Sequence, residues 1–160
     1  KIIQHMGPWY QTCGFKTEKY EKYLNKLNYK ENQYYINRAN NAFINNEFSF
    51  NFHRTMYNKP SELSLLEFNI RKLLTSSLFM SLITSITNIQ ISQLQTMFLA
   101  RFSSGHFLSP HSDKGNGKIA FVINLTRNWK PQYGGNLHFL NSSRDEIIKV
   151  ITPKFNSLIL

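Results

Sequence analysis

The spacing of apolar residues changes near Gln93, and this change constrains the fold more than any other feature of the sequence. Before it, apolar residues recur every three or four positions in the segments 61–74 and 77–86, which predicts two amphipathic helices. After it, short apolar runs alternate with turns rich in Gly, Asn and Pro; these runs are LQTMFLARF, KIAFVINL, NLHFL, EIIKVI and SLIL. Helices followed by short strands predict an α+β domain whose second half is a sandwich or a barrel.

The first 60 residues give weaker signals. The segment TEKYEKYLNKLN, residues 17–28, places Tyr20, Tyr23 and Leu24 on one stripe with charged residues opposite, which predicts a further amphipathic helix. Asn is abundant between Asn25 and Asn58, which indicates either a biased genome or exposed loops. The helix that follows Pro60 has two candidate N-caps, Ser61 and Ser64, and its apolar stripe includes Leu63, Leu66, Ile70, Leu73 and Leu74.

Length, charge and cysteine content narrow the class of protein. A chain of 160 residues has the length of one domain with a sizeable core. Its net charge of +10 favours anionic partners such as phosphates, acidic peptides or small carboxylates. The single Cys13 excludes an intramolecular disulfide and a CxxC zinc site, so we expect a reducing, cytoplasmic setting. The uncharged stretch 73–100 contains many Ser, Thr, Asn and Gln residues, so no membrane span is predicted.

The segment SPHSDKGNGK contains the one pattern that suggests a metal site. On an extended backbone, the side chains of His111 and Asp113 point to the same side, where an imidazole and a carboxylate can bind one ion. These are two of the three donors of the 2-His-1-carboxylate triad that binds Fe(II). Because H-x-D occurs often by chance, a solvated polar loop is the alternative.

Four pieces occur in the order found in one enzyme family: RFSSGHFLSPHSD, AFVINLTRNW, YGGNLHFL and ITPKFNSLIL. The run from Met97 to Leu160 thereby resembles the prolyl-hydroxylase branch of the Fe(II)/2-oxoglutarate-dependent dioxygenases, and SSLFMSLITSITNI resembles the helix that precedes the barrel in such proteins. The resemblance implies one dioxygenase domain over residues 1–160, with helical support in 1–90 and a double-stranded β-helix (jelly-roll) core in 91–160.

The resemblance also implies the chemistry. His111 and Asp113 would bind Fe(II), 2-oxoglutarate and O₂ would be cosubstrates, and ascorbate would support activity. The iron and its cosubstrate carry out the oxidation, and the substrate would be a prolyl residue of a protein or a related small molecule. An acidic residue at position 113 favours hydroxylation over halogenation, because halogenating relatives carry a small residue there.

Further pocket residues follow from the resemblance. Asn124 falls where several relatives carry a Tyr that hydrogen-bonds 2-oxoglutarate; its amide can donate a similar bond, or it satisfies only local backbone. Arg101 can bind an anionic substrate or cosubstrate through its fork of donors, or it is a snorkelling surface cation. Leu108, three residues before His111, matches a position where a Tyr is often found. The other predicted cosubstrate-pocket residues are Met97, Val122 and Leu137.

The remaining histidines do not complete the triad. His138 comes too early in the family order to be the second metal-binding His, which would follow the strand SLIL together with a basic residue for 2-oxoglutarate. Either the domain is incomplete at its C-terminal end or the protein is a degenerate relative without catalysis; we expect an incomplete domain, or another chain that supplies the closing strands. No role is assigned to His5, His53 or His106.

A noncatalytic function is the alternative. The jelly roll could be a binding module whose basic surface holds an anionic partner such as RNA. The 19 Lys and Arg residues are scattered, without an Arg-rich run or alternation of basic and aromatic residues, which disfavours nucleic acid as a partner.

Overall fold

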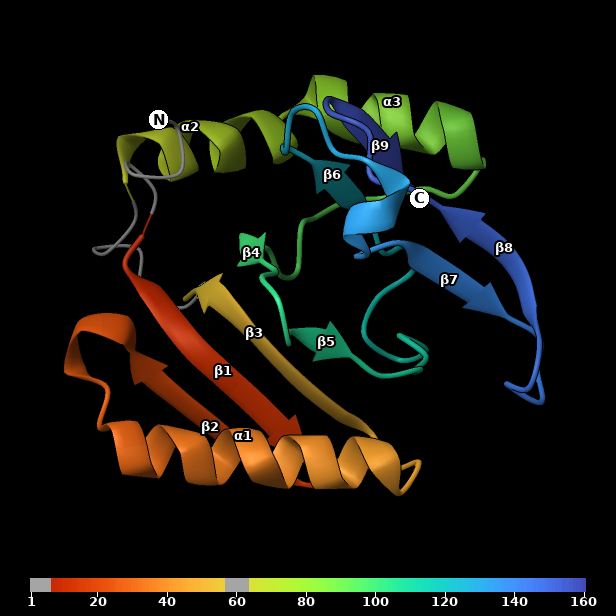
Figure 1. Ribbon diagram of the computed structural model, residues 1–160. Coiled ribbons are helices and arrows are strands. Elements are labelled where there is room, and N and C mark those ends of the chain that lie inside the picture. Colours follow the sequence, from red (N-terminus) through yellow and green to blue (C-terminus); the bar gives the residue numbers. More distant parts are fainter. Residues whose placement is uncertain (1–6, 57–63) are drawn as a thin grey trace. The chain divides into compact units, whose positions relative to one another are not determined.

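A computed structural model describes residues 7–56 and 64–160 (Figure 1). The described chain mixes α-helices with antiparallel sheets. It divides into two compact units, residues 1–109 and residues 110–160, which are described separately below. No helix in the described ranges is both long enough and apolar enough to cross a bilayer.

The first unit is built on an antiparallel sheet with the strand order β2-β1-β3-β4, and β5 also pairs with β3. The strands are β1 (Trp9–Phe15), β2 (Glu18–Tyr23), β3 (Ser49–Thr55), β4 (Ala100–Arg101) and β5 (Phe107–Leu108). Residues 1–90, for which helical support was predicted, contain three strands in the first 55 residues in addition to helices. The strand β3 also has partners that are distant in sequence, since it pairs with both β4 and β5.

The prediction of a helix over residues 17–28 is wrong. Residues Glu18–Tyr23 form β2, which returns antiparallel along β1 after a two-residue turn, and a short 3-10 helix, η2 (Leu24–Lys26), follows. Lys16 has φ +53° in this turn. Tyr20 is buried and stacks on Tyr35 at 4.1 Å between ring centroids. Strand pairing and this stacking prevail over the helical spacing of the segment.

The Asn-rich segment contains a helix, α1 (Tyr29–Ile44), that the sequence did not reveal. Asn28 caps it, since its Oδ1 accepts a hydrogen bond from the backbone N–H of Glu31 at 3.1 Å. Figure 1 shows α1 lying across the sheet. Its buried residues are the small Ala39 and Ala42, and they pack with the sheet residues Cys13, Phe15 and Tyr20.

Two predicted helices are confirmed, α2 (Leu65–Leu74) and α3 (Ser77–Thr87). The first begins with a capping box, in which Ser64 and Glu67 satisfy each other's backbone N–H groups. Ser64 is thus the cap, while Ser61 and Leu63 lie outside the described residues. Ser76 caps α3 through the N–H of Phe79.

The second unit contains two strand pairs. The strand β6 (Val122–Asn124) pairs with β9 (Ser157–Ile159), and β7 (Leu137–Leu140) pairs with β8 (Ile147–Ile151), with the 3-10 helix η4 (Pro131–Tyr133) before β7. Strands are confirmed in NLHFL, EIIKVI and SLIL. The strands expected in LQTMFLARF and KIAFVINL are confined to Ala100–Arg101 and Val122–Asn124. The described strands form three separate sheets, so the jelly roll stays a prediction.

Candidate functional site

The side chains of His111 and Asp113 face each other. The Nε2 atom of His111 lies 3.7 Å from Oδ1 of Asp113, and the two side chains are 33% and 58% exposed. The pair lies in the loop between β5 and β6 rather than in a regular strand. Their one-residue spacing still brings the imidazole and the carboxylate to the same side, in an accessible position.

The backbone after the pair turns sharply. The carbonyl oxygen of Asp113 accepts a hydrogen bond from the N–H of Asn116 at 2.9 Å, and the N–H of Lys114 donates to Oγ of Ser112 at 3.3 Å. Gly115 has φ +95°, and no atom lies within 4 Å of the place of a Cβ. Glycine is therefore favoured here by its backbone conformation rather than by crowding.

The backbone before the pair is tied to the sheet of the first unit. The N–H of Ser109 donates to the carbonyl of Ser49 at 3.0 Å, and the N–H of Ser49 donates to Oγ of Ser109 at 2.9 Å. Both residues are buried. Ser109, two positions before His111, is thus held against β3 by both bonds.

The donor set of the pair fits a ferrous ion in part. Imidazole nitrogen and carboxylate oxygen are both donors that non-haem Fe(II) sites use. Among the described residues, no group of three or more His, Cys, Asp or Glu side chains could hold a metal. From this pair, the described residues therefore offer two protein donors to a metal ion, one from His111 and one from Asp113.

The segment that contains the pair matches a known protein family. Residues 97–160 match the 2OG-Fe(II) oxygenase superfamily. The matched segment covers about two-fifths of the chain and includes both His111 and Asp113. No curated protein and no solved structure matches the chain. The resemblance over Met97 to Leu160 is confirmed at the level of this superfamily.

Three of the predicted cosubstrate residues lie on strands of the second unit. Asn124, on β6, donates a hydrogen bond from its side-chain nitrogen to Oγ of Ser157 on β9 at 3.1 Å. Val122 lies on the same strand and is exposed, and Leu137 lies on β7 opposite Ile151 and is exposed. The contact between Asn124 and Ser157 orients the amide, while binding of 2-oxoglutarate by these residues stays a prediction.

The other three predicted residues belong to the first unit. Met97 precedes β4, and Leu108 lies on β5 opposite Phe50 with its side chain exposed. Arg101 lies on β4 opposite His53 of β3. The Nη2 atom of Arg101 is 2.8 Å from Nδ1 of His53, and its guanidinium lies 5.0 Å from the centroid of the Trp9 ring.

Sequence reasoning missed the polar cluster around Arg101, to which His53 and His106 belong. The two imidazole rings meet edge to face with centroids 4.5 Å apart. His53 also contacts Gln11, which is buried on β1. The alternation of polar and aromatic residues in SFNFHRT could have indicated a polar face on this strand.

This cluster makes stability depend on pH. Burial, the neighbouring His106 and the charge of Arg101 lower the pKa of His53 from 6.5 to about 4. As pH falls from 6.5 towards 4, the unfolded chain binds this proton and the folded chain does not, so stability present above pH 6.5 is lost. The full shift corresponds to ~3 kcal/mol. Because solvent screens a partly buried group, we expect about half that loss in urea titrations across this pH range.

The variant His53→Asn provides the control for this prediction. Asn can still accept a hydrogen bond from Arg101 but does not titrate. Its stability should therefore fall less between pH 6.5 and 4 than that of the wild type. His106, whose pKa is also lowered, mainly by burial, contributes to both proteins. Equal pH slopes for the two proteins would contradict the assignment to His53.

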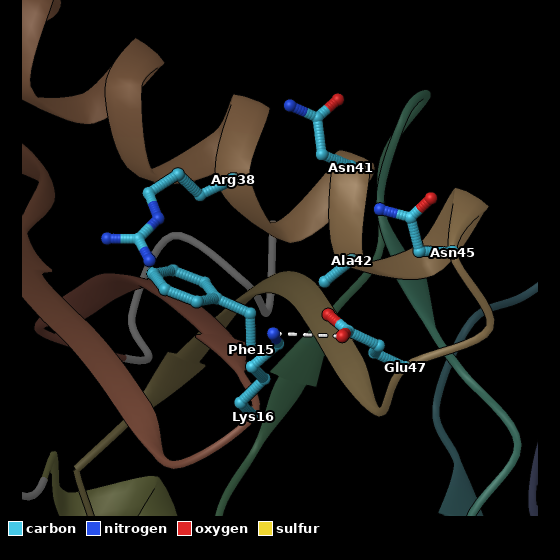
Figure 2. Close-up of a pocket in the computed structure, with 7 residues that line it drawn as sticks. All are labelled: Phe15, Lys16, Arg38, Asn41, Ala42, Asn45 and Glu47. Carbon is cyan, nitrogen blue, oxygen red and sulfur yellow. Dashed lines mark ion pairs between the residues drawn. The ribbon is translucent and has the colours of Figure 1, made fainter.

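A pocket on the surface of the first unit is lined by none of the predicted site residues (Figure 2). Its cations are already paired: Nζ of Lys16 is 2.9 Å from Oε1 of Glu47, and Arg38 binds Glu18 at 2.9 Å. The guanidinium of Arg38 also lies over the Phe15 ring at 4.5 Å. The pocket is lined by Phe15, Lys16, Arg38, Asn41, Ala42, Asn45 and Glu47. These ion pairs leave it little net charge with which to attract an anionic ligand.

Proposed function

We propose that this chain is an Fe(II)- and 2-oxoglutarate-dependent hydroxylase and that His111 and Asp113 bind its metal. The observation that carries the proposal is the 3.7 Å approach of His111 Nε2 to Asp113 Oδ1 within the segment that matches the oxygenase superfamily. A solvated loop does not require an imidazole and a carboxylate to converge, whereas a shared metal ion does.

The residues around the pair have defined tasks in this proposal. A neutral imidazole of His111 offers Nε2 to the metal, and Asp113 offers a carboxylate oxygen that also offsets the positive charge. The turn closed by Asn116 holds the backbone at Asp113. With O₂, the bound iron supplies an oxidation in which 2-oxoglutarate gives succinate and CO₂ and a substrate C–H becomes C–OH.

The residues named by the resemblance are proposed to contact the cosubstrate or the substrate. Asn124 offers polar contacts to 2-oxoglutarate, and the bond to Ser157 limits how its amide can turn. Arg101 offers positive charge, and the apolar positions are Met97, Leu108, Val122 and Leu137. The substrate that we propose is a prolyl residue of a protein, or a related small molecule.

The nested pairing of the second unit supports a jelly-roll core. The strands β6 and β9 pair across the whole β7–β8 hairpin. A long hairpin that rolls up on itself produces such nesting. A cytoplasmic location is part of the same proposal and rests on Cys13, which is fully buried.

The noncatalytic alternative is less well supported. In the first unit, Lys16, Lys19, Lys22, Arg38 and Arg54 each form an ion pair with a carboxylate. Their charge is therefore partly compensated within the chain, which weakens the argument from net charge to an anionic macromolecule.

The test of the proposal is succinate formation by the full-length protein. It is mixed with Fe(II), 2-oxoglutarate, ascorbate and proline-containing peptides, and succinate and hydroxylated peptide are measured. Succinate should form only with iron and should be abolished by EDTA or by Asp113→Ala. If the full-length protein neither binds iron nor forms succinate, the hydroxylase proposal is wrong. Hydroxylation of a small molecule but no peptide would correct only the substrate.

A further inference from the structure

Arg101 is the starting point of a chain of hydrogen bonds that crosses the sheet of the first unit. Arginine is only a donor, so Nδ1 of His53 must accept the 2.8 Å bond from Nη2 of Arg101. The hydrogen of the neutral ring is then on Nε2, which donates to Oε1 of Gln11 at 3.1 Å. Gln11 Nε2 in turn donates to Oδ1 of Asn51 at 2.6 Å. The tautomer of His53 is thereby fixed by its two neighbours.

The chain of bonds ends on the backbone. Asn51 donates from Nδ2 to the carbonyl of Gly105 at 3.3 Å, in the turn after β4. Gln11 and Asn51 are 2% and 3% exposed, so their amides are held within the packed sheet. Because the donor and the acceptor of each bond in the series are defined, the series fixes the orientation of the Arg101 guanidinium.

At the Arg101 end of this series of hydrogen bonds, two donors lack an acceptor among the described residues. Nε of Arg101 and Nε1 of the adjacent Trp9 are buried and have no hydrogen-bond partner in the described part of the chain. Leaving such groups unpaired is unfavourable, and more so for a charged donor. An acceptor at this position would satisfy them.

Among the residues that the structure describes, no carboxylate is paired with Arg101. Arg54, which follows His53 on β3 and points to the opposite face of the sheet, forms an ion pair with Glu21. A carboxylate ligand has both properties that the site lacks, because it carries negative charge and only accepts hydrogen bonds.

We propose that Arg101 and Trp9 form a carboxylate-binding subsite and that His53 is a positioning residue that orients the guanidinium. The ligand is a carboxylate of 2-oxoglutarate or of an acidic substrate, and for 2-oxoglutarate the inference rests on the proposed function. Because the Trp9 ring covers the guanidinium, entry of a carboxylate requires this ring to move. Binding therefore changes the surroundings of Trp9.

This movement provides a readout that needs neither iron nor activity. The protein has two Trp residues, so Trp129→Phe leaves Trp9 as the only indole. In this background, in buffer freed of metal ions by a chelating resin, fluorescence is followed during titration with 2-oxoglutarate, succinate, an acidic peptide and the uncharged dimethyl ester of succinate. We expect saturable changes with the carboxylates and none with the ester. The tighter binder among 2-oxoglutarate and the acidic peptide identifies the source of the carboxylate.

Substitutions separate the role of each group. Arg101→Gln should weaken carboxylate binding at least about 10-fold, as expected for the loss of one charge-assisted hydrogen bond. His53→Leu should weaken it several-fold, and His53→Asn, which keeps an acceptor for Arg101, should restore most of the affinity. Arg38→Gln is the matched control, since Arg38 already binds Glu18, and it should leave the affinity unchanged. Circular dichroism checks that each variant is folded, and Arg101→Lys replaces Arg101→Gln if the latter is not.

Failure of the carboxylate-binding subsite can be distinguished from failure of the proposed hydroxylase function. No saturable signal, equal binding of the ester, or unchanged affinity in the folded Arg101 variant would overturn the subsite even if succinate is formed with iron. Conversely, metal-free carboxylate binding that depends on Arg101 and His53 would stand even if His111 and Asp113 bind no iron. If His53→Leu and His53→Asn weaken binding equally, His53 does not position Arg101.

Discussion

Fe(II) affinity is expected to fall by about 100-fold or more when His111 is replaced by Ala, and by a similar factor for Asp113→Ala. Each substitution removes one of the two donors that face each other at 3.7 Å. Loss of a residue that only supports a metal ligand commonly costs 10- to 100-fold in affinity, so loss of a ligand should cost at least the upper value. Anaerobic titration with Fe(II), followed by calorimetry, measures the effect directly.

The chain offers a matched control for this experiment. His138 lies on β7, is exposed, and has Val150 as its cross-strand partner, so His138→Ala removes an imidazole without touching the pair. Its iron affinity should equal that of the wild type. Asp113→Glu tests geometry, because it keeps the carboxylate but lengthens the side chain. Equal affinity for the His111 and His138 variants would remove the pair from the metal site.

A loss of about 3 kcal/mol in unfolding free energy is expected for Gly14→Ala. Gly14 lies in β1 opposite Phe50 of β3. A Cβ at this position would overlap the Phe50 ring, and the backbone φ is not in the left-handed region, so the cause is purely steric. Overpacking of this kind typically costs 1–3 kcal/mol, and we expect the upper end because the overlap involves several ring atoms. Urea titration monitored by circular dichroism measures the loss.

Two further variants identify the cause. Adding Phe50→Ala to Gly14→Ala removes the ring, so the double variant should be less destabilised than the sum of the two single changes. Gly105→Ala, where φ is +79° and no atom is near, should cost only about 1 kcal/mol for backbone strain. Additive effects at positions 14 and 50 would show that the ring is not responsible.

The strands and helices that the sequence predicted are those specified by local signals. Ser64 and Ser76 cap α2 and α3, and both act over three residues. The strands β7 to β9 are bounded by turns that contain Gly, Asn or Pro. The approach of His111 to Asp113 is also local, because it depends only on one-residue spacing in the chain.

The features that were missed depend on distant partners. Arg101 and His53 are 48 residues apart in sequence and meet only because β4 pairs with β3. In the same way, β2 is a strand because β1 lies beside it, although its own spacing suits a helix. Propensity and periodicity cannot identify such partners, since tertiary pairing overrides them.

The bond from Asn51 to Gly105 has a consequence for local opening. It joins the turn after β4 to the same side-chain series that begins at Arg101, while Ser109 closes the end of β5 on Ser49. Fraying at any point between residues 101 and 109 therefore breaks contacts at the others. We expect the amide hydrogens of this segment to exchange with deuterium at one shared rate, as a single cooperative element.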